Sequence, residues 1–187
     1  MKNPYLYGYL PLFSILLFSL TFGIFAVGES LQLLSSIGIY SGMREFLTDF
    51  ELRVLLLIVF ALCFFMLFSA LKLIGETIHE LGMLFFSKDK SGETISVARG
   101  GYVIFFFGAL ISAFGMKSMI ILLIIFILTV LTYFVYNIYK LSQYLTLTGT
   151  IGLIIFEVMF WAIFLTLIIM VVLKLYNGVL VSLPFAK

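Results

Sequence analysis

An unbroken apolar run near the carboxyl end constrains this chain more than any other feature. Residues 149–173 contain a single charge, Glu157, and the nearest basic residues on either side are Lys140 and Lys174. A helix of these 25 residues, rising about 1.5 Å per residue, is long enough to cross a hydrocarbon core of about 30 Å. The run therefore predicts a transmembrane helix, with Glu157 close to the middle of the bilayer.

The composition of the whole chain points the same way. Hydrophobic residues make up 64% and charged residues 11%, whereas soluble domains have about 45–50% and about 25%. The mean hydropathy of +1.26 excludes a water-soluble domain of this size. A single cysteine, Cys63, excludes an intramolecular disulfide and a thiolate metal site. A net charge of +2 gives no indication of a nucleic-acid partner.

Four more uncharged runs are long enough to cross a membrane. They hold 26, 18, 17 and 22 residues and lie between Lys2 and Glu29, Arg53 and Lys72, Arg99 and Lys117, and Lys117 and Lys140. Continuous apolar runs exclude a transmembrane barrel, whose strands alternate in polarity. We therefore expect an all-α fold, a polytopic transmembrane helical bundle forming one integral membrane domain over residues 1–187. Its five spans cover about 8–28, 53–74, 98–115, 118–139 and 148–174.

The opening of the chain carries a resemblance. Residues 2–11 read KNPYLYGYLP and are followed by five apolar runs. This arrangement resembles the YufK-like family of small multi-pass membrane proteins of bacilli. The resemblance implies a bacterial plasma-membrane location and an uncharacterised function, and it supplies no catalytic residues.

The basic residues give an expected orientation. The connection between the second and third spans, with its flanks, holds Lys72, Lys88, Lys90 and Arg99, whereas the first connection holds only Arg44 and Arg53. Basic residues accumulate in cytoplasmic loops. We therefore expect the second connection and the amino terminus to be cytoplasmic.

The third span contains a regular line of small residues. Gly101, Gly108 and Gly115 recur every seven residues, and Ser112 falls on the same helix face. Small residues let two helix backbones approach closely inside a membrane. We expect this face to pack against another helix of the same chain, with pairing of two copies or a protein partner as the alternative.

Polar residues on the fourth span lie at the depth expected for Glu157. Thr129, Tyr133 and Asn137 share one face, and the first two lie too far from Lys140 to reach the headgroups. Intramembrane acids face the interior of a helix bundle. We expect Glu157 to form a hydrogen bond with Tyr133 or Thr129, which pins two helices together. A role in ion or proton movement is the alternative.

The chain has one histidine, in a polar stretch after the second span. Glu76, His79 and Glu80 share a helix face because they are spaced by three and one residues. They could form part of a metal site, but transition-metal sites need three or four ligands and usually more than one histidine. The polar face of an interfacial helix is the favoured interpretation. A pH-responsive role for His79 stays open, because histidine changes charge near neutral pH.

The sequence lacks the motifs of an enzyme. No serine has a histidine at a matching depth, and no glycine-rich phosphate loop is present. We expect no catalysis and no cofactor, with the lipid bilayer as the main partner. An accessory or interaction role is the favoured hypothesis. The alternatives are a small ion or proton transporter that uses Glu157 and a membrane sensor that uses the His79 region.

Overall fold

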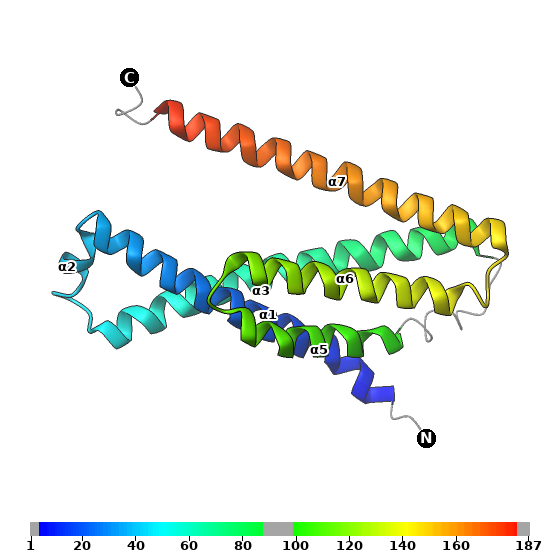
Figure 1. The fold of residues 1–187 in the computed structure, drawn as a ribbon, viewed down its shortest axis with the longest axis horizontal. Helices are drawn as coiled ribbons and strands as arrows, with labels where there is room; N and C mark the ends of the chain where they lie inside the picture. Colours follow the sequence, from blue (N-terminus) through cyan, green and yellow to red (C-terminus); the bar gives the residue numbers. More distant parts are fainter. Residues whose placement is uncertain (1–3, 88–98, 183–187) are drawn as a thin grey trace. The chain divides into compact units, whose positions relative to one another are not determined.

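The protein is built from helices. The computed structural model describes residues 4–87 and 99–182, and each element within them is helical. The α-helices in Figure 1 are α1 (Pro4–Ser36), α2 (Ile39–Met43), α3 (Asp49–Phe86), α5 (Tyr102–Ser112), α6 (Met119–Leu141) and α7 (Leu147–Ser182). Short 3₁₀ turns, η1 (Arg99–Gly101) and η2 (Ala113–Gly115), flank α5. The predicted all-α class is confirmed.

Within residues 4–87 and 99–182, four helices are long and apolar enough to cross a membrane. They cover Gly8–Ser36, Asp49–Phe86, Met119–Leu141 and Leu147–Gly178. The predicted third span is shorter than expected, because its described apolar helix runs only over Tyr102–Gly115. At about 1.5 Å per residue this helix covers roughly 20 Å, which is less than a hydrocarbon core of about 30 Å. Residue 98 of that predicted span lies outside the described residues.

Three helices extend well beyond their predicted spans. α1 continues to Ser36, α3 to Phe86 and α7 to Ser182, which is eight, twelve and eight residues past the predicted ends. Charges mark the end of an apolar run, but they do not end a helix. The chain turns after α1 at Gly38, the one described residue with a positive φ, at 77°. Gly75 and Gly82, by contrast, lie within α3, so the segment around His79 continues this helix and is not a separate one.

The chain forms two compact units, which are described separately. Unit 1 holds Met1–Gly75 and Asp89–Tyr144, and unit 2 holds Glu76–Lys88 and Leu145–Lys187. The single domain expected from the sequence stays a prediction. The core of unit 1 is formed by Phe18, Phe22, Phe68, Ala109 and Leu122. Aromatic rings fill it at close range, and the centroids of Phe18 and Phe126 lie 5.3 Å apart.

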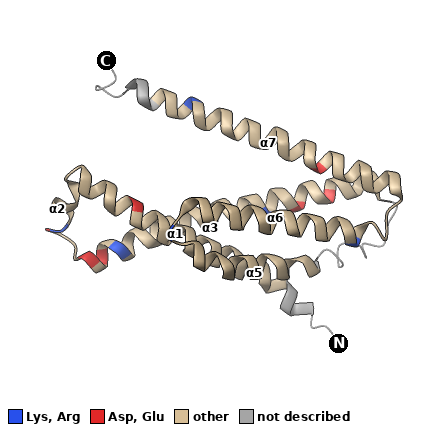
Figure 2. Ribbon diagram, in the orientation of Figure 1, with Lys and Arg blue, Asp and Glu red and all other residues tan. Residues whose placement is uncertain are grey.

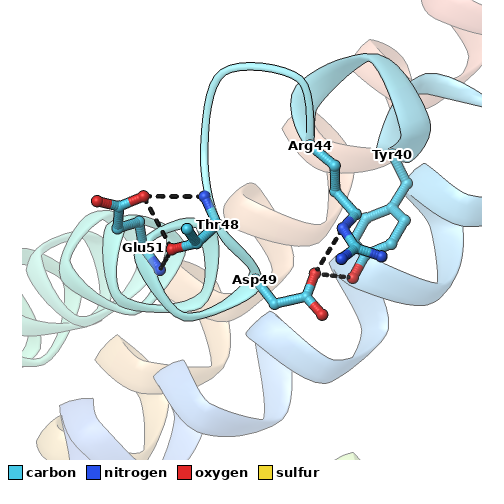
Figure 3. Close-up of polar contacts among 5 residues, drawn as sticks. All are labelled: Tyr40, Arg44, Thr48, Asp49 and Glu51. Carbon is cyan, nitrogen blue, oxygen red and sulfur yellow. Dashed lines mark hydrogen bonds and ion pairs between the residues drawn. The ribbon is translucent and has the colours of Figure 1, made fainter.

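Charged residues cluster in the connection between α1 and α3 and on the adjoining helix ends, whereas α5 contains none and α6 contains only Lys140 (Figure 2). In this connection the Tyr40 hydroxyl donates a hydrogen bond of 2.5 Å to Asp49 Oδ1. Arg44 Nε lies 3.2 Å from the same oxygen (Figure 3). The hydrogen bond to the Asp49 carboxylate raises the pKa of Tyr40, because loss of the phenol proton would place two negative charges together.

A capping box starts α3. The backbone N–H of Thr48 donates to Glu51 Oε2 at 2.8 Å, and the backbone N–H of Glu51 donates to Thr48 Oγ1 at 3.3 Å (Figure 3). These reciprocal bonds satisfy backbone donors that the first turn of a helix leaves without partners. The sequence Thr48-Asp49-Phe50-Glu51 has the spacing that this motif requires.

Replacement of Thr48 by alanine tests the capping box. We expect Thr48→Ala to lower the free energy of unfolding by about 1 kcal/mol, the usual effect of losing a hydroxyl at a helix start. Thermal unfolding in detergent measures the change. Thr132→Ala is the matched control, because the exposed Thr132 hydroxyl bonds only to Leu128 O of its own helix. Equal effects of the two substitutions would contradict a capping role.

Candidate functional site

Unit 2 brings the only histidine of the chain against Glu157. His79 Nδ1 on α3 lies 2.7 Å from Glu157 Oε1 on α7. The Glu157 side chain is 8% exposed and the His79 side chain is 21% exposed. The contact is therefore a short hydrogen bond between two largely buried side chains. It becomes an ion pair when His79 carries a second proton.

Glycines allow α3 and α7 to approach closely around this contact. A Cβ atom at Gly82 would lie 2.5 Å from Leu153 Cδ1, and one at Gly152 would lie 2.5 Å from Phe86 Cε1. A Cβ atom at Gly149 would lie 2.8 Å from the backbone oxygen of Phe86. Real Cβ atoms do not come this close to other atoms. The absence of side chains at these positions therefore lets the two helices reach hydrogen-bonding distance.

The site offers an imidazole and a carboxylate, which can share or exchange a proton. The predicted partial metal site gains no support: within the described residues, no three His, Cys, Asp or Glu side chains lie close enough together to hold an ion. The sequence placed Glu76, His79 and Glu80 on one face of a helix, and the structure shows that His79 contacts Glu157 on α7.

The polar residues of α6 belong to unit 1. Thr129 is buried, and its hydroxyl donates to Ile125 O at 2.7 Å. The Tyr133 ring packs on Phe105, with centroids 4.9 Å apart. Asn137 is 5% exposed, and its Oδ1 has no hydrogen-bond partner among the described residues. A bond from Glu157 to Tyr133 or Thr129 would join the two units, so it stays a prediction.

The glycines of the third predicted span lie against α6. A Cβ atom at Gly108 would collide with the Thr129 side chain, and one at Gly101 would lie 2.7 Å from the Tyr133 ring. Around Gly115 the contacts are looser, at 3.1 Å from Ile121. This face is therefore occupied within the chain. Pairing of two copies through it stays a prediction, and it would require α6 to move away.

Ser112 makes a contact that the sequence did not reveal. Its hydroxyl lies 2.9 Å from Thr21 Oγ1, and this hydrogen bond joins α5 to α1 at a fully buried position. Ser112 also donates to Ala109 O at 2.6 Å. The residues Thr21 and Ser112 are 91 positions apart. The small-residue spacing identified the face of α5, but nothing in the sequence identified the hydroxyl partner on α1.

Comparisons with known proteins identify the family. Residues 27–184 match the Family of unknown function (DUF5366), which is most of the chain. The protein belongs to this family. It is 40% identical over 184 residues to the "Uncharacterized membrane protein YufK" of Bacillus subtilis (strain 168), covering 98% of this chain and 100% of that relative. The resemblance drawn from the opening residues is confirmed. No solved structure matches the chain.

The relative and the long apolar helices identify this chain as a membrane protein. The relative is named as one, and four helices here have the length and apolarity to cross a bilayer. The family description assigns no activity. The function must therefore be argued from the polar contacts and the packing of this chain.

Proposed function

We propose that this protein is a five-span plasma-membrane protein with an accessory or interaction role and no catalysis of its own. The observation that carries the proposal is the use of its buried polar groups. His79 bonds to Glu157, and Thr21 bonds to Ser112. Other buried hydroxyls bond to carbonyl oxygens of their own helices, as Ser14 does to Leu10 O and Ser19 to Ile15 O. The first two contacts join helices, the hydroxyl–carbonyl bonds stay within one helix, and neither kind of contact is arranged to act on a substrate.

Chain connectivity supports the fifth span. Gly149 at the start of α7 lies against Phe86 at the end of α3, so these two ends share one side of the membrane. Five residues join α6 to α7, and they reach at most about 20 Å, which is too short to recross the core. If α6 crosses the membrane, its start lies on the opposite side from Phe86. The segment from residue 87 to residue 118 must then cross, and α5 is its apolar helix.

The basic residues support the proposed orientation. Lys72 and Arg99 flank the connection after α3, and Lys88 and Lys90 lie within it. Cytoplasmic connections are enriched in such residues. With five crossings, the amino terminus lies on the same side as this connection. The amino terminus is therefore cytoplasmic and the carboxyl terminus lies outside.

Flux measurements test the accessory role against transport. We expect purified protein in sealed vesicles to pass no more protons or alkali cations than empty vesicles under an imposed gradient. Transporters usually contain several intramembrane polar residues and interrupted helices, whereas α7 carries one acid over 25 residues. Flux that Glu157→Gln abolishes, with folding unchanged, would overturn the accessory proposal in favour of an ion or proton transporter.

The contact between His79 and Glu157 favours a second candidate, a membrane sensor. Histidine changes charge between about pH 5 and pH 8. A change of charge on His79 would alter the strength of a contact that joins α3 to α7. Sensing through this contact requires only that water reach the pair.

A further inference from the structure

The end of α3 carries too many ionisable groups to lie deep in the membrane. Glu76, His79 and Glu80 fall within five residues of this helix. An ionisable side chain at the centre of a bilayer costs at least about 2.5–3.5 kcal/mol when charged. The uncharged part of α3, from Val54 to Leu71, already has the length of a crossing. The segment around His79 therefore lies at the boundary of the hydrocarbon core.

The contacts of unit 2 bring Glu157 to that same level. Glu157 bonds to His79, and Leu153 and Gly149 contact Gly82 and Phe86 farther along α3. The residue numbers rise on α3 while they fall on α7. The two helices therefore run antiparallel in a register that several contacts define. Glu157 cannot lie at the bilayer centre while His79 lies at the edge.

The remainder of α7 is long enough to cross the membrane by itself. Residues 158–178 form 21 residues of the candidate span, or about 31 Å of helix. Lys174 near the far end can extend its amino group to the interface. Trp161 lies one turn inside Glu157 and Tyr176 lies near the other end. Tryptophan and tyrosine are enriched at the two interfaces of a membrane.

We infer that His79 and Glu157 form a clasp at the membrane boundary, on the side of the connection that follows α3, and that α7 crosses the bilayer from about Val158. This inference goes beyond the accessory role and does not depend on it. The neighbouring charged groups are Lys72, Glu76 and Glu80 on α3, and α7 holds no other ionisable side chain from Leu147 to Leu173.

The clasp is strongest when His79 carries two ring protons and Glu157 is ionised, because the short hydrogen bond is then also an ion pair. A neutral imidazole can still donate this hydrogen bond, but without the attraction between opposite charges. The strength of the contact between α3 and α7 therefore depends on the protonation states of these two side chains.

Cysteine labelling tests the position of the clasp. In a Cys63→Ser background, Ile155→Cys and Ile163→Cys form a matched pair, because these side chains are 60% and 55% exposed. Maleimides react with ionised thiols, which require water. We expect a membrane-impermeant maleimide to label position 155 at least about tenfold faster than position 163, because a thiol within hydrocarbon stays protonated. The labelling at 155 occurs only from the side of the connection after α3.

If the maleimide labels neither position 155 nor position 163 but does label Lys174→Cys, the boundary position is wrong and Glu157 lies at the bilayer centre. Labelling of position 155 from the opposite side would overturn the sidedness. These variants leave His79 and Glu157 intact, so the result does not depend on whether the clasp mutants fold.

Thermal unfolding tests the contact itself. We expect Glu157→Gln and His79→Gln each to lower the unfolding midpoint, because each removes one partner of the short hydrogen bond. Glu80→Gln is the control that keeps the wild-type midpoint, because Glu80 is exposed next to His79 without joining the bond. A wild-type midpoint for both Glu157→Gln and His79→Gln would overturn the clasp.

Discussion

Gly108→Ala is expected to destabilise the protein by about 3 kcal/mol, the upper part of the usual range for a side chain forced into a packed interior. Gly108 is buried on α5, and a Cβ atom there would lie 2.5 Å from Thr129 Cγ2. The obstacle is a β-branched side chain within α6, which has little freedom to rotate away. The two helices must therefore separate. The measurement is thermal or denaturant unfolding in detergent.

A matched substitution separates this clash from any general effect of alanine. Gly28→Ala introduces the same methyl group in α1, where no atom lies within 4 Å of the new Cβ. We expect it to be neutral or slightly stabilising, because alanine favours a helix more than glycine does. The double variant Gly108→Ala with Thr129→Gly should recover part of the loss. Equal stability of Gly108→Ala and Gly28→Ala would contradict the close approach of α5 and α6.

Glu157→Ala is expected to lower the free energy of unfolding by about 1–3 kcal/mol, because the largely buried His79 loses its hydrogen-bond acceptor. The Glu157 side chain is only 8% exposed, so water replaces the lost acceptor poorly. Packing between Gly82, Gly149, Gly152 and their neighbours remains. The variant should therefore fold with a lower unfolding midpoint.

Glu80→Ala is the control for this second prediction. It removes the same carboxylate from an exposed position adjacent to His79. Exposed charges away from special contacts usually change stability by less than about 0.5 kcal/mol. If Glu157→Ala and Glu80→Ala have the same free energy of unfolding, the carboxylate of Glu157 has no structural role.

The sequence predicted the helices best where charges enclose a short apolar run. α6 was expected at 118–139 and covers Met119–Leu141. α7 was expected to start at 148 and starts at Leu147. For α1, α3 and the end of α7 the same reasoning located the apolar part but not the helix ends. A helix can continue past a charge into the interface, and α1 ends only just before Gly38, which adopts a positive φ.

The candidate site could be predicted only in part. The seven-residue spacing of Gly101, Gly108 and Gly115 indicated a packing face, and periodicity alone carries that information. Helix periodicity could not predict that Glu157 contacts His79, because the two residues are 78 positions apart along the chain. The apolar run around Glu157 suggested a position in the middle of the span. Periodicity within one helix cannot reveal the register between two helices.

The contact between His79 and Glu157 is central to this account, and a double-mutant cycle measures it most directly. Unfolding free energies are compared for the wild type, His79→Gln, Glu157→Gln and the double variant at pH 6. We predict a coupling of about 1 kcal/mol, in the range measured for hydrogen bonds between membrane helices. Additive effects of the two substitutions, with no coupling, would contradict a direct contact and with it the clasp that joins α3 to α7.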